Sequence, residues 1–294
     1  MRRWVAVGAA IAGGTAAGIA AAVTVAAVLW NRETVRGAAR LRARHDAQAP
    51  PPFSRDDLAG LPDPVVRYFE FALTPGQAVV RSARFRQTGE FAMRAGAWSP
   101  FTAVQYFSGE PPGFLWDARI RMAPMISCYV RDSYVAGEGV MDGTLAALVP
   151  VLQERGTPVM ASGELLRYLA EAVFLPTALL PRGGIAWAPL GENTARVTLT
   201  DRATTVSCDV SFGARGEIVR VSALRARAAG GTLVSTPWVG RFSDYRPVEG
   251  MMIPMSGEVE WVLPEGPLPY FRGRMVDARY EFAPSRTNAP STST

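Results

Sequence analysis

The sequence predicts a β-dominated α+β domain, in which a curved antiparallel sheet has one helix before it and one helical insertion in its middle. Apolar and polar residues alternate with a period of two over most of residues 78–282, as they do in strands with one buried face. Short turns separate these strands, which favours antiparallel pairing of neighbours. Residues 55–73 and 143–180 have helical periodicity instead. A sheet of about ten strands tends to curl and needs its concave face filled.

Residues 1–30 predict one transmembrane helix before the domain. Residues 4–30 contain no charged side chain over 27 positions, and Trp4 and Trp30 lie at the two ends. About 20 helical residues cross a bilayer core of roughly 30 Å, whereas the apolar region of a cleaved signal peptide has about 7–15 residues. We therefore expect a retained single-pass anchor in the lipid bilayer. Close approach of two such helices, and hence a homodimer, is allowed by the spacing of Gly14 and Gly18.

Residues 31–54 are predicted to form a basic, proline-rich linker. Five arginines follow the apolar segment within 15 residues, and three consecutive prolines begin at Pro50. The arginines favour a cytoplasmic domain, but a long translocated domain can override this bias, so the side of the membrane stays open. The chain has no lysine and much alanine, which is typical of a GC-rich bacterial genome. The expected location is therefore a bacterial cell membrane.

The charge distribution argues against nucleic acid as a partner. Residues 1–45 hold seven arginines and one acidic residue, and the rest of the chain is close to neutral. The sequence pI of about 9.6 therefore describes the N-terminal segment. The domain itself has no excess of positive charge with which to bind phosphate backbones.

The first helix of the domain is predicted within residues 55–73. Ser54 and Asp57 can cap its first turn. Val65, Phe69 and Leu73 lie on one stripe, which predicts the buried face of an amphipathic helix.

The stretch "PPGFLWDARIRMAP", residues 111–124, predicts a strand with two opposed faces. One face is apolar and is expected to point toward the interior: Phe114, Trp116, Ala118, Ile120 and Met122. The other face carries most of the charge and is expected to point to solvent: Leu115, Asp117, Arg119 and Arg121. Cross-strand Asp–Arg pairs are the ordinary use of such a face, and an anion or headgroup site is the alternative.

The insertion at residues 143–180 is predicted to contain two helices. A short one covers "GTLAALVPVLQER" and is interrupted at Pro150. The clearer one starts at Ser162 as its N-cap and ends at Pro176. Its polar residues are expected to form ion pairs on an exposed face: Glu164, Arg167 and Glu171.

Strands resume after the insertion and complete a single domain over residues 55–282, with a disordered tail at 283–294. Two cysteines are too few for a disulfide scaffold. Cys208 lies on the apolar face of a strand, so we expect a buried thiol, although a disulfide to Cys128 stays open.

The residue inventory excludes most catalytic chemistry. The single histidine, His45, lies in the linker, and lysine is absent, so the domain can hold no His-dependent triad, His/Cys zinc site or lysine nucleophile. No glycine-rich nucleotide-binding motif follows a strand. We therefore expect no cofactor and no metal, and we name no catalytic residue.

The candidate binding residues are of two kinds. An apolar wall inside the curved sheet is predicted from Trp116, Met122, Phe91 and Trp261, because aromatic and methionine side chains line adaptable apolar sites. The same residues would also serve simply as core. A polar site is the second candidate: Asp117, Arg119, Arg121 and Glu164.

Several blocks of the chain resemble those of a bacterial family of unknown function over residues 55–282. These blocks are "LPDPVVRYFEFAL", "PPGFLWDARIRMAP", "VRDSY", "GELLRYLAEAVFLPTALLP", "TPWVGRFSDY" and "IPMSGEVEWVLPEG". The order of elements is also similar to the half-barrel of lipoprotein-carrier and lipid-binding proteins, which implies a half-barrel fold by analogy.

Three functions follow from these observations as hypotheses. The first is a non-catalytic, membrane-anchored module that binds a lipid or another apolar ligand. The second is an enzyme that uses carboxylate and arginine groups, with Asp117, Arg119 and Glu164 in one cleft. The third is a structural or regulatory partner of another membrane protein, which would act through the Gly14/Gly18 stripe or an exposed sheet edge.

Overall fold

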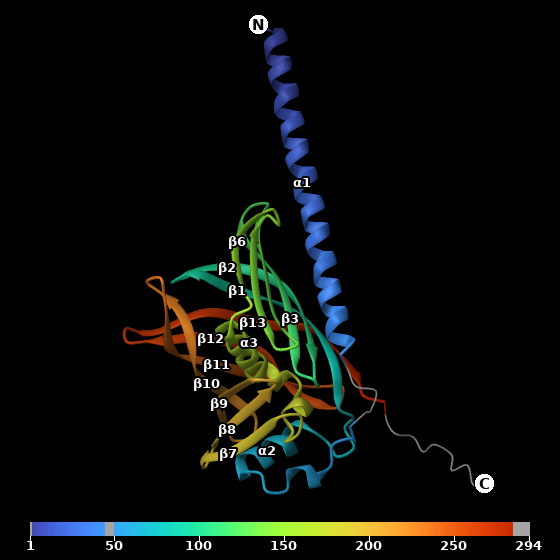
Figure 1. The fold of residues 1–294 in the computed structure, drawn as a ribbon, viewed down its shortest axis with the longest axis vertical. Helices are drawn as coiled ribbons and strands as arrows, with labels where there is room; N and C mark the ends of the chain where they lie inside the picture. Colours follow the sequence, from blue (N-terminus) through green and yellow to red (C-terminus); the bar gives the residue numbers. More distant parts are fainter. Residues whose placement is uncertain (1, 45–49, 285–294) are drawn as a thin grey trace, which may run out of the picture.

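The computed structural model describes residues 2–44 and 50–284, with residues 2–17 and 19 described by their backbone alone. The described chain forms one antiparallel sheet of 13 strands that curves around a helix, as Figure 1 shows. The predicted fold class, a curved antiparallel sheet with few helices, is confirmed.

The helices and strands have the following bounds. The helices are α1 (Arg2–Arg42), α2 (Asp63–Ala72) and α3 (Pro158–Glu171), with the 3-10 turns η1 (Arg55–Leu58), η2 (Ala172–Phe174) and η3 (Pro176–Leu179). The first six strands are β1 (Val80–Arg94), β2 (Ala97–Ser108), β3 (Gly113–Ala123), β4 (Ile126–Val135), β5 (Glu138–Leu145) and β6 (Val149–Arg155). The last seven are β7 (Ile185–Gly191), β8 (Thr194–Asp201), β9 (Thr204–Phe212), β10 (Ile218–Ala229), β11 (Thr232–Val248), β12 (Met251–Leu263) and β13 (Gly266–Phe282).

Two meanders meet in the middle of the sheet. Strands β1–β6 follow one another by hairpins, as do β7–β13, and β1 pairs with β13 to join the two halves. Helix α3 contacts β3, β4 and β5 of the first half and β9 and β10 of the second half. The sheet therefore wraps around α3, which fills its concave face (Figure 1).

Aromatic side chains on the inner face hold the two halves together. The ring of Phe85 on β1 lies 5.6 Å from that of Phe107 on β2 and 5.6 Å from that of Tyr280 on β13. Phe174, just after α3, approaches the same ring to 5.9 Å. Full burial of one such side chain stabilises the fold by about 1.5–3 kcal/mol.

The predicted first helix is confirmed as η1 followed by α2. The backbone N–H of Ser54 donates a hydrogen bond of 2.9 Å to the Asp57 carboxylate, which closes the first turn. Val65, Phe69 and Leu73 are all buried, as their spacing predicts. Helix α2 packs against β8 and β12 at the base of the sheet.

The short helix predicted over residues 143–155 is wrong, because β5 and β6 form a hairpin there. Pairing of β5 with β4 supplies the backbone hydrogen bonds that a helix would otherwise supply, and Pro150 is tolerated because β6 is an edge strand. Ala146 and Ala147 adopt positive φ angles of 53° and 60° in the tight turn between the strands. The sheet accordingly has more strands than expected.

The clearer helix is confirmed as α3, with different ends. Thr157, and not Ser162, caps its N-terminus, since the Thr157 hydroxyl accepts a hydrogen bond of 3.1 Å from the backbone N–H of Met160. The α-helix ends at Glu171, and two 3-10 turns separated by Leu175 continue to Leu179. Cys128 and Cys208 are buried free thiols, so the open disulfide is not formed.

Helix α1 extends to Arg42, so most of the basic part of the predicted linker is helical. Among the described residues, no helix combines the length and hydropathy needed to cross a bilayer, and more than half of residues 4–30 lie outside the described side chains. The transmembrane helix and the Gly14/Gly18 dimer therefore stay predictions. The rest of the predicted linker, 45–49, and most of the predicted tail, 285–294, also lie outside the described residues.

Candidate functional site

A pocket lies inside the curve of the sheet, between α3 and strands β1, β2 and β11–β13. Its apolar lining comprises Phe174, Trp238, Phe242, Met255, Val259, Phe271 and Met275. Its volume is about 50 Å³ for a water-sized sphere, and the surrounding groove encloses about 560 Å³ when the part open to solvent is included. One buried water needs roughly 10–15 Å³ by the first measure, so the pocket has room for several waters.

Three glycines lie side by side across β1, β13 and β12, and the last of them, Gly257, leaves part of this space open. Gly89 on β1 pairs with Gly273 on β13, and Gly273 pairs with Gly257 on β12. At Gly89 a Cβ atom would lie 2.0 Å from the carbonyl oxygen of Arg272, so the backbone requires glycine there. At Gly257 the nearest atoms to a Cβ would be 3.8 Å away, an ordinary contact distance. Gly257 is therefore not required by backbone packing, and its missing side chain contributes to the pocket volume.

The floor of the pocket is a continuous chain of polar side chains. The indole N–H of Trp116 donates to Gln87 at 2.9 Å, and the amide of Gln87 donates to Gln105 at 2.8 Å. Gln105 in turn donates to the Glu171 carboxylate at 2.5 Å, and Arg167 donates to the other oxygen of Glu171 at 2.9 Å. Three strands and α3 are thus joined by one hydrogen-bond network in the interior.

Arg167 connects this floor to deeper carboxylates. Its guanidinium forms ion pairs with Asp132 and with Glu171, and it lies 4.9 Å from the centre of the Trp116 ring. Glu164 is only 2% exposed, and its Oε2 atom has no hydrogen-bond partner among the described residues. The prediction that Glu164, Arg167 and Glu171 form an exposed helix face is therefore wrong, because the sheet curves over that face of α3.

Burial raises the pKa of Glu164 to about 8, and the neighbouring Asp132 adds to this effect. Arg167 and Arg225 act in the opposite direction but do not compensate for burial. With Glu164 protonated, two guanidinium groups face two carboxylates, and the cluster is close to neutral. This balance suits a low-dielectric interior, where an unpaired charge is costly.

Replacing Glu164 by glutamine is expected to stabilise the fold at pH 8 by roughly 4 kcal/mol. The folded chain keeps the Glu164 proton at pH values where the unfolded chain has lost it, so the wild-type free energy of unfolding falls as pH rises from about 4.5 to about 8. Urea denaturation of E164Q across this pH range should show a flatter profile.

The matched control for this prediction is Glu171→Gln on the same helix. The Glu171 carboxylate accepts hydrogen bonds from Arg167 and Gln105. A glutamine at this position offers only one acceptor oxygen and no charge, so Glu171→Gln is expected to destabilise the fold. Equal effects of E164Q and E171Q on the free energy of unfolding would contradict the assignment of Glu164 as the protonated member of the cluster.

The charged outer face of β3 is the docking site of α1. Asp117 accepts hydrogen bonds from the indole N–H of Trp30, at 3.0 Å, and from the Thr34 hydroxyl. Arg131, opposite Asp117 on β4, donates to the Trp30 carbonyl and the Thr34 hydroxyl, each at 2.7 Å, and lies over the Trp30 ring. The prediction that Asp117 and Arg119 point outward is confirmed, but a helix and not only solvent meets this face.

Replacing Asp117 by alanine is expected to loosen α1 from the sheet. Trp30 and Thr34 lose their acceptor, and Arg131 loses the nearest carboxylate, at a cost of about 1–3 kcal/mol. Limited trypsin digestion should then cleave faster after Arg36 and Arg40. Glu33→Ala, which removes an exposed ion pair with Arg36 and none of the hydrogen bonds to Asp117, should leave the cleavage rate near that of the wild type.

The structure separates the residues of the predicted polar site. Asp117 and Arg119 lie on the outer face, with the Arg119 guanidinium 5.1 Å from the Tyr129 ring centre, and Arg121 is exposed. Glu164 is inside, on α3. The hypothesis of one cleft formed by Asp117, Arg119 and Glu164 is therefore wrong, because the sheet itself lies between the two sets.

The predicted apolar wall is only partly assembled. Trp116 is buried and donates to the pocket floor, and Phe91 and Trp261 both pack against the ring of Tyr270, at 5.9 and 6.0 Å. The Tyr270 hydroxyl accepts a hydrogen bond from Trp238 in the pocket wall. Met122 is 44% exposed and does not belong to the wall, because it lies near the β3–β4 turn, beyond the core.

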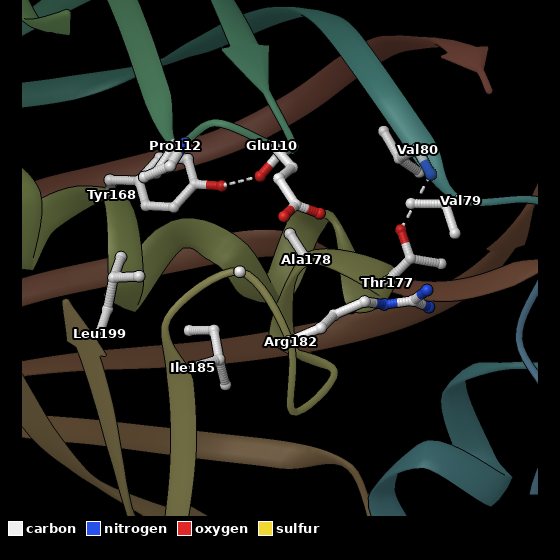
Figure 2. Close-up of a pocket in the computed structure, with 12 residues that line it drawn as sticks. Val79, Val80, Glu110, Pro112, Tyr168, Thr177, Ala178, Arg182, Ile185 and Leu199 are labelled. Carbon is white, nitrogen blue, oxygen red and sulfur yellow. Dashed lines mark hydrogen bonds between the residues drawn. The ribbon is translucent and has the colours of Figure 1, made fainter. Parts of the chain in front are cut away.

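A second pocket lies at the base of the sheet, beside the β2–β3 turn and η3, and is shown in Figure 2. Its volume of about 20 Å³ suits a single water. Tyr168 donates to the Gly109 carbonyl at 2.9 Å, and the Thr177 hydroxyl accepts from the Val80 N–H at 3.0 Å. These bonds fasten α3 and η3 to the strand ends, so this pocket is a structural junction.

Comparison with known proteins identifies the family. The model of the "Family of unknown function (DUF6544)" matches residues 51–273. The chain belongs to this family. The family resemblance predicted from the sequence blocks over residues 55–282 is thereby confirmed. No curated protein matches the chain by sequence.

Two solved structures are similar to this DUF6544 chain at low identity. A LolA superfamily protein from Nitrosomonas europaea has 12% identity and a TM-score of 0.39, with 75% of this chain and 93% of that chain covered. A beta-barrel-like protein of the domain of unknown function DUF1849 from Brucella abortus has 12% identity and a TM-score of 0.21, with 69% and 99% covered.

Several pocket residues of this DUF6544 chain are absent from the sequence predictions. Glycine inside a strand often marks a close backbone approach, and this signal was available at Gly89, Gly257 and Gly273. Gln87 on β1 and Gln105 on β2 point inward, at positions where the alternating pattern of a strand normally places an apolar residue. Only the register of the sheet brings these residues together.

Proposed function

We propose that this protein is a membrane-anchored, non-catalytic module that binds an amphiphilic, lipid-like molecule in the pocket of the concave face. One observation carries the proposal: an apolar wall and a polar floor meet in one opening, at which Gly257 presents no side chain. Such a combination, with a few placed polar groups in an apolar site, is typical of small-molecule pockets.

The apolar part of the ligand would lie against β11–β13. Phe242, Met255 and Phe271 supply flexible and aromatic surface there, and Phe174 closes the side toward α3. Methionine adapts to irregular apolar shapes, which suits chains of variable length. The enclosed part of the pocket, about 50 Å³ for a water-sized sphere, opens into the surrounding groove, so the ligand would extend into both.

The polar part of the ligand would lie at the floor, beside Gln105, Glu171 and Arg167. Both oxygens of Glu171 already accept hydrogen bonds, and Arg167 already pairs with two carboxylates. Arg274, the other arginine of the lining, pairs with Asp244. An anionic group would therefore lack a free counter-ion, whereas a hydroxyl or an amide can join the network. This chemistry supports an uncharged polar group on the ligand in place of a phosphate.

The anchor is the second part of the proposal. Residues 4–30 are uncharged, and α1 continues as one helix from Arg2 to the outer face of β3. The docking of Trp30 and Thr34 would fix the orientation of the domain relative to that helix. A domain held in this way stays within reach of lipids in the same bilayer.

Native mass spectrometry of the full-length chain, extracted in mild detergent, tests the binding proposal. We expect a population that carries one extra mass in the range of a membrane lipid, which organic extraction releases. A single mass equal to that of the bare chain, in detergent mild enough to preserve a known lipid carrier analysed alongside, would overturn the proposal.

A further inference from the structure

We propose that the β3–β4 and β5–β6 hairpin tips form a membrane-contact surface, which rests on the lipid bilayer beside the anchor helix. This inference rests on the anchor in the proposed function and adds a second contact between the domain and the membrane. The tip surface is defined here by Met122, Met125, Ile126, Leu145, Leu148 and Val149.

The tips expose more apolar surface than turns normally do. Met125 is fully exposed and Val149 is 57% exposed, and the other four members of the tip surface are between 38% and 44% exposed. Residues 144–151, "TLAALVPV", contain no charged side chain. Hairpin turns of soluble domains usually carry polar residues, so a cluster of exposed apolar tips indicates a contact surface.

Strand polarity places both tips at the same end of the sheet. Strands β3 and β5 are both antiparallel to β4, so they run in the same direction, and each ends at its own tip. The two turns therefore lie side by side, because β4 starts at the first turn and pairs with β5, which ends at the second. Figure 1 shows the β5–β6 hairpin extending toward the N-terminal part of α1.

Helix α1 runs along the sheet toward that end. Its Leu41 lies near Gly113 at the start of β3, whereas its Trp30 lies against Asp117 and against Tyr129 of β4. Ile126, the first residue of β4 after the β3–β4 turn, is three strand residues, or about 10 Å, from Tyr129 toward the tip. Seven helical residues cover the same distance, so the tips are level with about residue 23 of α1.

The part of α1 that extends beyond the tips has the length that is needed to cross a bilayer core. Residues 4–22 are uncharged and lie beyond the level of the tips, and a helix of that length spans roughly 29 Å, close to the thickness of a bilayer core. If residues 4–22 cross the core, the tip surface meets the membrane interface. Arg121, exposed on β3 close to its tip, then lies near the headgroups.

An environment-sensitive fluorophore on single introduced cysteines tests this inference in the full-length chain. Both native thiols are buried, so a maleimide fluorophore reacts at the introduced site. The tip variants are Met125→Cys and Leu148→Cys, the control at the opposite end of β5 is Glu138→Cys, and the anchor variant is Ala10→Cys. Each labelled chain is reconstituted into vesicles of phosphatidylcholine and phosphatidylglycerol, with and without nitroxide-labelled phosphatidylcholine.

We expect a blue shift and quenching by nitroxide lipid at positions 125 and 148, and neither at position 138. Quenching at position 10 without quenching at 125 and 148 would overturn the membrane-contact surface and leave the anchor intact. Absence of quenching at all four positions would overturn the anchor as well. A blue shift at 125 and 148 without quenching would mean that a protein covers the tips, and would also overturn the inference.

Discussion

Replacing Arg167 by methionine is expected to lower the free energy of unfolding by about 3–5 kcal/mol. Methionine keeps much of the side-chain volume but removes the guanidinium that pairs with Asp132 and Glu171. Asp132 is only 5% exposed, so its carboxylate would be left buried without its closest cation. Removing one partner of a buried ion pair lowers the free energy of unfolding by more than the pair itself contributes, because the remaining charge stays buried without a counter-ion. Urea denaturation measures the loss.

The control is an exposed pair of the same chemistry. Arg196 donates two hydrogen bonds to Asp209, at 2.7 and 3.1 Å, but its side chain is half exposed. Arg196→Met is therefore expected to change the free energy of unfolding far less than Arg167→Met does. A loss for Arg167→Met no larger than that for Arg196→Met would show that the interior cluster does not hold α3 to the sheet.

Replacing Gly257 by leucine is expected to abolish ligand binding while the domain stays folded. Its side chain would project into the pocket beside Phe242, at a position where a Cβ atom meets nothing closer than 3.8 Å. The leucine would therefore occupy the space of the ligand. We expect the affinity for a fluorescent lipid to fall at least about tenfold, which corresponds to about 1.4 kcal/mol.

Gly257→Ala is the matched control, since its single methyl group fits at ordinary contact distance. It should bind close to the wild-type affinity, and its melting temperature should agree with that of the wild type within a few degrees. Wild-type binding by a folded Gly257→Leu variant would place the ligand elsewhere on the molecule.

The strands and their faces could be predicted from local pattern, but the hairpin of β5 and β6 could not. Alternation in "GFLWDARIRMA" identifies the two faces of β3, because alternate side chains point to opposite faces and one face is buried in the core while the other is not. The sequence "TLAALVPV" has helical composition and becomes strand because β5 pairs with the edge of β4 and β6 then pairs with β5. Tertiary pairing of this kind cannot be seen in a window of ten residues.

The pocket was less accessible to sequence analysis than the fold. Trp116 was identified because a large aromatic residue on an apolar strand face is a strong local signal. Spacing on a helix predicts an exposed face for Glu164 and Arg167, because spacing cannot show that a sheet curves over that polar face. The row of Gly89, Gly273 and Gly257 depends on the register of β1, β13 and β12, which only the assembled sheet defines.

Photocrosslinking tests the central claim, that a ligand occupies the concave pocket, most directly. The full-length chain is irradiated in membranes that contain a lipid with a photoreactive group on its acyl chain, and the labelled peptides are sequenced. We predict label on β11 and β12, at peptides that contain Phe242 and Met255, and loss of that label in the Gly257→Leu variant. Label confined to α1 and the hairpin tips, unchanged by Gly257→Leu, would contradict the account.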